Sequence, residues 1–342
     1  MEISNQKVKV NSRPVTATIV LAAGLLAVAL SIGWAVSVGA ADIQLRTVWE
    51  AIFCFNPDLT QHQIIHELRL PRVLAAALVG ACFAVAGALM QGMTRNPLAD
   101  SGLLGLNAGA AFALALCFAF FPGLPYPYII LYSFVGAALG AGLVYGIGSL
   151  SRQRLTPIRL TLAGAAVSAL LVALSEGIAI YYRVGQDMAF WYAGGVAGVT
   201  WSQLKWMAPL VAGALTGSLL ISRSITLLSL GDEVATGLGE RTGRVKTLAI
   251  LNVLALAGAA VSVAGPISFI GLMVPHIARF LVGVDYRWII PSSAVLGSLL
   301  MVLADMGGRI LNPPYETPVG TIIALLGVPF FLYLARQERR NL

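Results

Sequence analysis

Long stretches without a charged residue constrain this chain more than any other feature. No Asp, Glu, Lys or Arg occurs between Arg13 and Asp42, and none occurs between Asp100 and Arg152. A helix of about 20 mostly apolar residues crosses the hydrocarbon of a bilayer. The composition agrees, because 58% of the 342 residues are apolar and only 11% are charged, against about 25% charged in soluble domains. The sequence therefore predicts an all-α polytopic membrane protein, with residues 1–342 forming one transmembrane domain.

Ten stretches are long and apolar enough to be expected as spanning helices. One unbroken run is divided at Pro122-Gly123-Leu124-Pro125 and another at Gly265-Pro266, because adjacent Pro and Gly mark turns. The first run is longer than the core of a signal peptide, so we expect it to be retained. The predicted spans are 15–39, 73–93, 101–121, 129–150, 157–181, 201–222, 246–264, 267–282, 288–304 and 317–335.

The basic residues predict the orientation of these spans. Ten spans put both termini on one side of the membrane, and sixteen of the 22 Lys and Arg residues fall on that side. Loops rich in Lys and Arg stay in the cytoplasm, so both termini are expected there. The six basic residues expected outside are Arg46, Arg69, Arg72, Arg183, Lys205 and Arg309.

Glycine recurs at a spacing of four residues within the apolar runs. Small residues one turn apart let two membrane helices approach closely, so this spacing favours tight packing over a mere abundance of glycine. The pairs are Gly105/Gly109, Gly136/Gly140, Gly142/Gly146 and Gly213/Gly217.

Motifs for catalysis, metal binding and nucleotide binding do not occur in the sequence. Cys54, Cys82 and Cys117 form no C-x-x-C pair. His62 and His66 have the spacing of a zinc-protease helix, but Gln63 stands where that motif needs its catalytic glutamate. No Gly-Lys pair exists for a phosphate-binding P-loop. We therefore expect no enzyme activity, and neither a cofactor nor a metal on this chain.

Few ionisable residues fall within the predicted spans. Glu176 lies near the outer end of its span, where it could either line a water-filled path or reach the lipid headgroups. His276, after Pro275, is expected to be a packing residue. A proton- or sodium-driven carrier would need several carboxylates near the membrane midplane. A transporter without them must receive its energy from a partner.

The longest expected cytoplasmic connection, residues 223–246, contains a pattern that suits contact with such a partner. Acidic residues stand where a short helix would start, which the helix dipole favours, and apolar residues follow on roughly one side. The alternative is a solvated loop. The residues expected to contact the partner are Leu230, Gly231, Asp232, Glu233, Ala235, Leu238 and Gly239.

Three arginines stand out on the expected outer side, which is otherwise poor in basic residues. Arg69 and Arg72 precede the second span, and Arg309 follows the ninth. The planar guanidinium group suits bidentate pairing with carboxylates. The arginines are therefore either a docking site for an acidic protein surface or interfacial anchors.

Several of these segments resemble the permease subunits of ABC importers for iron-siderophores, haem and cobalamin. The resemblance runs from the first span to the C-terminus. The segments that carry it are Arg69 to Arg72, Asn96 to Gly105, Leu230 to Gly239 and Ala264 to His276.

The resemblance implies a type II ABC importer permease with ten membrane helices. It implies a second permease subunit, identical or related, two cytoplasmic ATPase subunits that bind ATP and Mg²⁺, and an extracytoplasmic binding protein. It also implies that Leu230 to Gly239 is the coupling helix and that Arg69, Arg72 and Arg309 pair with the binding protein. The segment around Ala189 to Gly198, with Trp191, Gly194 and Gly195, would border the translocation path together with Glu176.

The cargo is the least determined property. Residues 94–109 and 312–318 are most similar to siderophore permeases, particularly the ferric-hydroxamate group of Gram-positive bacteria, which implies residence in the bacterial plasma membrane. Haem or cobalamin import within the same family stays open, as does ion-coupled secondary transport. No nucleic-acid partner is expected.

Overall fold

Helices form all the regular structure that the computed structural model describes, which covers residues 12–39, 43–150, 157–312 and 315–338. Seven helices are long and apolar enough to cross a membrane, and three shorter apolar helices accompany them. The seven are α1 (Pro14–Ser37), α4 (Leu70–Thr94), α6 (Tyr126–Leu150), α7 (Pro157–Tyr181), α9 (Trp201–Ser229), α11 (Thr242–Ala264) and α13 (Tyr286–Ile310). The three are α5 (Leu106–Phe120), α12 (Ile270–Val282) and α14 (Val319–Glu338). Each predicted span coincides with one of these helices, so the all-helical polytopic fold is confirmed, while the count of ten crossings stays a prediction.

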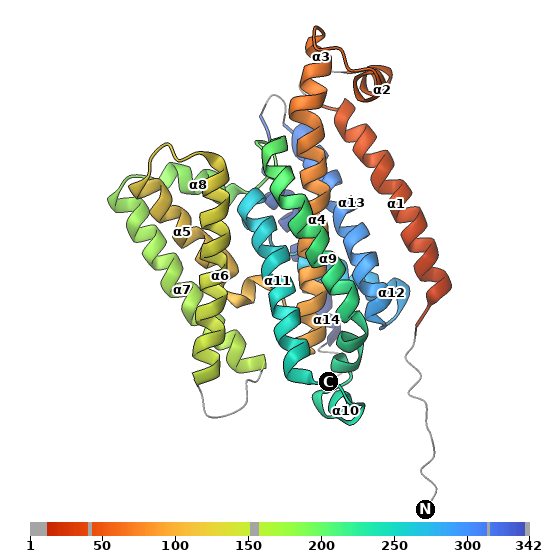
Figure 1. Cartoon of the computed structure of the whole chain (residues 1–342), viewed down its shortest axis with the longest axis vertical. Helices are drawn as coiled ribbons and strands as arrows, with labels where there is room; N and C mark the ends of the chain where they lie inside the picture. The colour runs from red at the N-terminus through yellow and green to blue at the C-terminus, as the bar shows by residue number, and fades with distance from the viewer. Residues whose placement is uncertain (1–11, 40–42, 151–156, 313–314, 339–342) are drawn as a thin grey trace, which may run out of the picture.

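Short helices occupy the connections between the long ones. On the side expected to be outside, α2 (Leu45–Phe53), α3 (Thr60–Gln63) and the π-helical turn η1 (Ile64–Arg69) lead into α4, and α8 (Gly185–Ala193) follows α7. On the other side lie the 3₁₀ turn η2 (Ser101–Leu104) and α10 (Asp232–Gly237). Figure 1 shows α3 and α10 at opposite ends of the molecule.

Helix α4 is the centre of the fold. It packs against α9, α11, α12 and α13, and nearly every residue from Val79 to Met93 is buried. Two glycines allow this packing, because a side chain at Gly80 would overlap the carbonyl of Gly297 and one at Gly87 would overlap the carbonyl of Gly271. Between membrane helices such close backbone contact replaces the hydrophobic effect as the source of stability.

The spaced glycine pairs behave in two ways. Gly109 lies against the carbonyl of Gly136, and Gly140 lies against the carbonyl of Gly105, so both pairs form the contact between α5 and α6. The spacing of four therefore indicates close packing only where a partner helix is present. A methyl group at Gly142, Gly146 or Gly213 would meet open space.

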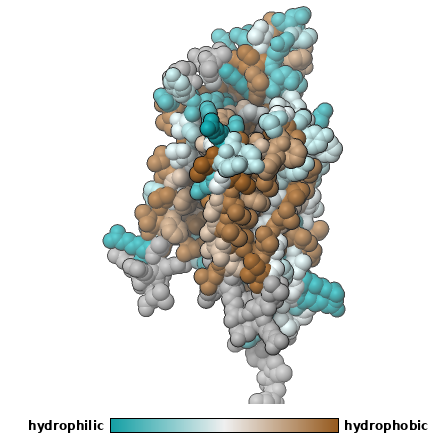
Figure 2. Space-filling view, turned by 90° about the vertical axis from the view of Figure 1, so that its left-hand side faces the viewer, coloured by the Kyte–Doolittle hydropathy of each residue, from teal (hydrophilic) through white to brown (hydrophobic). Residues whose placement is uncertain are grey.

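A second group of helices, α5 to α8, lies beside the core around α4 and meets it mainly through α6 and α11 (Figure 1). Figure 2 shows hydrophobic side chains over the middle of the face that carries this group, with hydrophilic ones towards the top. Large apolar side chains such as Leu139 and Leu220 are exposed on the long helices. A surface of this kind is expected to face lipid.

The connection between α9 and α11 is shorter than the predicted loop of residues 223–246. Helix α9 continues to Ser229, and α11 already begins at Thr242. The prediction ended the span at the charge of Arg223, but Ile225 and Leu228 are fully buried and keep the chain helical against the core. A charge at a membrane boundary ends the span without ending the helix.

Candidate functional site: outer ion cluster, path hollow and cytoplasmic helix

An ion cluster forms around Asp305, whose side chain is 1% exposed. Nε and Nη2 of Arg72 donate hydrogen bonds to Oδ1 of Asp305 at 3.0 and 2.9 Å. Nη1 of the same arginine donates to Oε1 of Glu316 at 2.7 Å, and Nη2 of Arg309 lies 3.1 Å from Oδ2 of Asp305. The cluster joins the start of α4 to the end of α13 and to the segment before α14. We call these four residues the outer ion cluster.

Arg69 and Arg309 also hold the outer end of α1. Nη1 of Arg69 donates to the carbonyls of Val36 and Ser37, each at 2.8 Å. Nη1 of Arg309 donates to the carbonyls of Ala35 and Val38, also at 2.8 Å. The last carbonyls of a helix have no intrahelical partner and carry partial negative charge, so cations bind there. The structure thus turns these two side chains into the protein, and their docking role stays a prediction.

Glu316 is the accessible member of the outer ion cluster, with 47% of its side chain exposed. The hydrogen bond from Arg72, opposed in part by burial, lowers the pKa of this carboxyl below its usual value. Glu316 is therefore ionised at neutral pH and occupies the side of the Arg72 guanidinium that a carboxylate from outside would reach.

A hollow of about 380 Å³ lies beside the outer ion cluster. We call it the path hollow; its walls are α8, the turn at 194–199, the end of α11 and residues 316–319. Trp191, Gly194 and Gly195 line it, as does Arg72. Of the four predicted path residues the structure brings these three together, while Glu176 is exposed on α7 and does not line the hollow.

Two glycines shape the wall of the path hollow. Gly194 has φ +67° and Gly195 has φ +148°, which other residues adopt only with strain. The turn lets the amide of Gly195 donate to the carbonyl of Ala264 at 2.8 Å, which fixes α8 to the end of α11. The path role of these glycines stays a prediction.

The cytoplasmic helix α10 begins after Gly231, at φ +131°, and is followed by Gly239, at φ +87°. Asp232 accepts a hydrogen bond from Nζ of Lys246 at 2.6 Å, which fixes the helix to the start of α11. Ala235 is fully buried, whereas Val234 and Leu238 are 42% and 56% exposed.

The sequence pattern predicted that the apolar residues of this helix lie on roughly one side, but Ala235 faces the protein whereas Val234 and Leu238 face outward. Leu230 is 39% exposed, and Glu233 is also exposed. The outward face of α10 is thus partly apolar, as a helix that docks into a groove requires.

A second ion pair on the cytoplasmic side escaped the sequence analysis. Asp285 is almost fully buried and accepts a hydrogen bond from Nη2 of Arg287 at 2.7 Å. Burial alone would raise the pKa of Asp285, but hydrogen bonds from Arg287 lower it below its usual value. Oγ1 of Thr226 in α9 accepts a hydrogen bond from the amide of Tyr286 at 2.9 Å and lies 3.4 Å from Oδ1 of Asp285. The spacing of Asp285 and Arg287, two residues apart in the sequence, is the signal that could have predicted this ion pair.

The three histidines do not form a metal site. His62 is buried and accepts a hydrogen bond from the amide of Asn56, while the ring of His66 packs against Trp201. His276 lies edge-on to Phe330, in agreement with the expected packing role. Within the described residues no group of three His, Cys, Asp or Glu could hold a metal ion.

Comparisons with known proteins agree with this architecture. The profile of the FecCD transport family matches residues 24–337. The iron(3+)-hydroxamate import system permease protein FhuB of Bacillus subtilis is 58% identical over 99% of this chain and 88% of its own length. The ferric enterobactin transport system permease protein FepD of Escherichia coli is 40% identical over 96% and 98%.

A solved structure gives the same result. A metal-chelate-type ABC transporter in an inward-facing conformation superposes with a TM-score of 0.82 at 26% identity, covering 94% of this chain and 99% of its own. The relatives are named permease proteins rather than ATPases or other enzymes. The outer ion cluster, the path hollow and the central α4 are therefore features of a multi-pass membrane permease that belongs to the FecCD transport family.

Proposed function

We propose that this chain is the permease subunit of an ATP-driven importer that carries a ferric siderophore of the hydroxamate type into the cytoplasm. The observation that carries the proposal is the 58% identity to the ferric-hydroxamate permease over nearly the whole chain. Relatives named for other iron compounds are less similar, at 40% for ferric enterobactin and 38% for hemin. An extracytoplasmic binding protein delivers the cargo, and a second permease subunit, identical or related, completes the path.

The path hollow supports a weak cargo site on the outer side. Its walls combine the ring of Trp191, the glycine turn and one ion pair, Arg72 with Glu316. Contacts of this kind hold a cargo loosely, and a transporter must release what it binds. Trp191, Gly194 and Gly195 are our proposed path residues in this hollow, and Glu176, exposed on α7, is proposed as a path residue outside it.

Energy enters through α10. Two partner ATPases, which bind ATP and Mg²⁺, close on ATP binding and move the outward face of α10. Lys246 and the buried Ala235 fix α10 to the core, so its displacement shifts α9 and α11 together. The residues proposed for this coupling are Leu230, Gly231, Asp232, Glu233, Ala235, Leu238 and Gly239.

The binding protein docks on Arg72, where one of its carboxylates takes the place of the Glu316 carboxylate. Arg72 already donates to Glu316, and a glutamate from the binding protein replaces it on the accessible side of the guanidinium. Arg69 and Arg309 support docking indirectly, because they fix the end of α1 beside this surface.

Uptake of radioactive iron by a bacterial strain that lacks the gene tests the cargo. We expect this chain to restore uptake of an iron-loaded trihydroxamate and to leave uptake of an iron-loaded tricatecholate and of haem unrestored. Leu238→Asp should abolish uptake while the partner ATPases keep their basal hydrolysis, because the charge cannot enter an apolar groove. Thr247→Asp, an exposed substitution on the neighbouring α11, is the matched control. Restoration of haem uptake alone would overturn the proposed cargo.

A further inference from the structure

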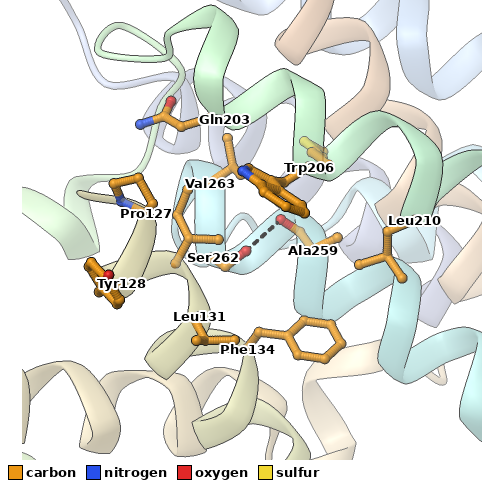
Figure 3. A pocket seen from close by; sticks show the side chains of 12 residues that line it. Pro127, Tyr128, Leu131, Phe134, Gln203, Trp206, Leu210, Ala259, Ser262 and Val263 are labelled. Carbon is orange, nitrogen blue, oxygen red and sulfur yellow. Dashed lines mark hydrogen bonds between the residues drawn. The ribbon is translucent and has the colours of Figure 1, made fainter. Parts of the chain in front are cut away.

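A second hollow, of about 670 Å³, opens between the outer ends of α6, α9 and α11. We call it the lateral crevice. Figure 3 shows its walls, in which Leu131 and Phe134 of α6 face Trp206 and Leu210 of α9 across Ala259 of α11. It shares only Ser262 and Val263 with the path hollow, so these two residues stand between the two spaces.

Two polar atoms of the lateral crevice, Oγ of Ser262 and Oε1 of Gln203, are already hydrogen-bonded within the protein. The hydroxyl of Ser262 donates to the carbonyl of Ala259 at 2.9 Å, as the dashed line in Figure 3 shows. Oε1 of Gln203 accepts the amide of Thr200 at 2.9 Å as part of the capping box of α9. The remaining walls are mainly hydrocarbon. A hydrated iron complex would lose its water there and meet few polar partners in return, so these walls favour an apolar occupant.

The apolar walls of the lateral crevice favour a hydrocarbon occupant over water. Side chains that line a void lose the dispersion contacts of their missing neighbours, and an apolar cavity does not retain water. Hydrocarbon restores these contacts without a polar cost.

The lateral crevice is continuous with the lipid-facing surface. Leu131 is 54% exposed and Trp206 is 76% exposed at its mouth. The exposed residues Val135 and Leu139 extend the same apolar surface along α6. The bilayer therefore reaches the crevice directly.

Its depth in the membrane fixes which leaflet supplies the ligand. The lining residues come from the first turns of α6 and α9 and the last turns of α11, the end that also carries the outer ion cluster. Tyr128 and Trp206 stand at this level, where aromatic residues mark the membrane interface. We propose that the lateral crevice binds one acyl chain of an outer-leaflet phospholipid, with the ester region beside Tyr128 and Gln203.

The bound acyl chain supports one wall of the path hollow. It packs against the outer face of Ser262 and Val263, whose other face borders the path hollow, and so it supports the wall that separates cargo from lipid. The inference depends on the membrane location of the chain and not on the identity of the cargo.

Photocrosslinking tests the proposal. The full chain, purified with its partner subunits, is reconstituted with phosphatidylglycerol that carries a diazirine on one acyl chain, and the labelled peptides are identified by mass spectrometry. We expect strong labelling of residues 128–134 and 203–210. Ala259→Phe should lower that labelling at least about fivefold, because the phenyl ring fills the space of the acyl chain.

Two further variants keep the test decisive. Leu131→Trp narrows the mouth from the surface, so it should lower crevice labelling even if Ala259→Phe does not fold. Ala212→Phe, the same substitution on the exposed opposite face of α9, should leave the labelling unchanged. Labelling spread evenly over all exposed helices, crevice labelling that survives both filling variants, or a crosslink from the crevice to a partner protein would each overturn the proposal.

Discussion

Asp305 holds two guanidinium groups where little water reaches them. Its carboxylate accepts hydrogen bonds from Arg72 and lies 3.1 Å from Arg309, whose side chain is 5% exposed. Removing one member of a buried charge group leaves the others without compensation, which costs more than the intact group contributes. Asp305 is therefore the residue on which the outer end of the protein depends most.

Asp305→Asn should lower the free energy of unfolding by about 3 kcal/mol, because two buried cations lose their common partner. The thermal unfolding midpoint of the purified protein measures this loss. Glu50→Gln removes the exposed pair with Arg46, in which the side chains are 86% and 50% exposed, and should change stability by less than about 1 kcal/mol. Equal shifts for the two variants would contradict the role of Asp305.

Glu316 gives the outer surface a dependence on pH. Because Arg72 lowers the pKa of its carboxyl, the stabilisation is present above the usual glutamate pKa and is lost only as the pH falls through the lowered folded value. Unfolding midpoints of the protein and of Glu316→Gln should therefore differ at pH 7 and converge in acid. A difference that stays constant down to strongly acidic pH would show that charge is not its cause.

The sequence singled out Arg69, Arg72 and Arg309, but it could not identify the residues with which they pair. Asp305 and Glu316 lie 233 and 244 residues from Arg72, and no local pattern joins such distant positions. The same limit applies to Asp232 and Lys246, which meet only because α10 folds back on α11.

At the scale of helices, the length of an apolar run predicted where a helix lies, but it did not predict which helices pack together. Every predicted span corresponds to a helix, since uncharged runs of this length have no alternative in a membrane. Helix ends were less predictable: α9 runs beyond Arg223 because its last turns pack on the core. The four spaced glycine pairs are alike in sequence, but only Gly105/Gly109 and Gly136/Gly140 lie against the backbone of a partner helix.

Helix α4 offers the clearest test of close packing. Gly87→Val should destabilise the protein by about 2 kcal/mol or more, because the side chain would overlap the backbone of Gly271. Gly142→Val, on an exposed face of α6 with open space around it, is the matched control. The fraction of folded protein after heating in detergent compares the two, and an equal loss would refute close packing as the cause.

At the scale of the whole molecule, the described helices hold few carboxylates that a coupled ion could use. Within the described helices Asp305 is bound to two arginines at the outer end, and Glu176 is exposed near the outer end of α7. We expect iron uptake to persist when an uncoupler collapses the proton gradient and to stop when ATP is depleted. The opposite pattern in energy-depleted cells would favour the ion-coupled carrier that the sequence left open.

Helix α1 is held by hydrogen bonds at both ends and packs against α13 between them, where Gly24 lies against the side chain of Val295. At its outer end, Arg69 and Arg309 donate hydrogen bonds to the last carbonyls of α1. At its other end, the amide of Arg13 donates to the carbonyl of Val282, at the end of α12, at 3.2 Å. Its middle turns carry Leu26 and Leu30 toward lipid. Because the packing on α13 and the hydrogen bonds at both ends act together, we expect α1 and α13 to move as one unit. Helix α1 thus connects the end of α12 on one side of the membrane to the end of α13 on the other.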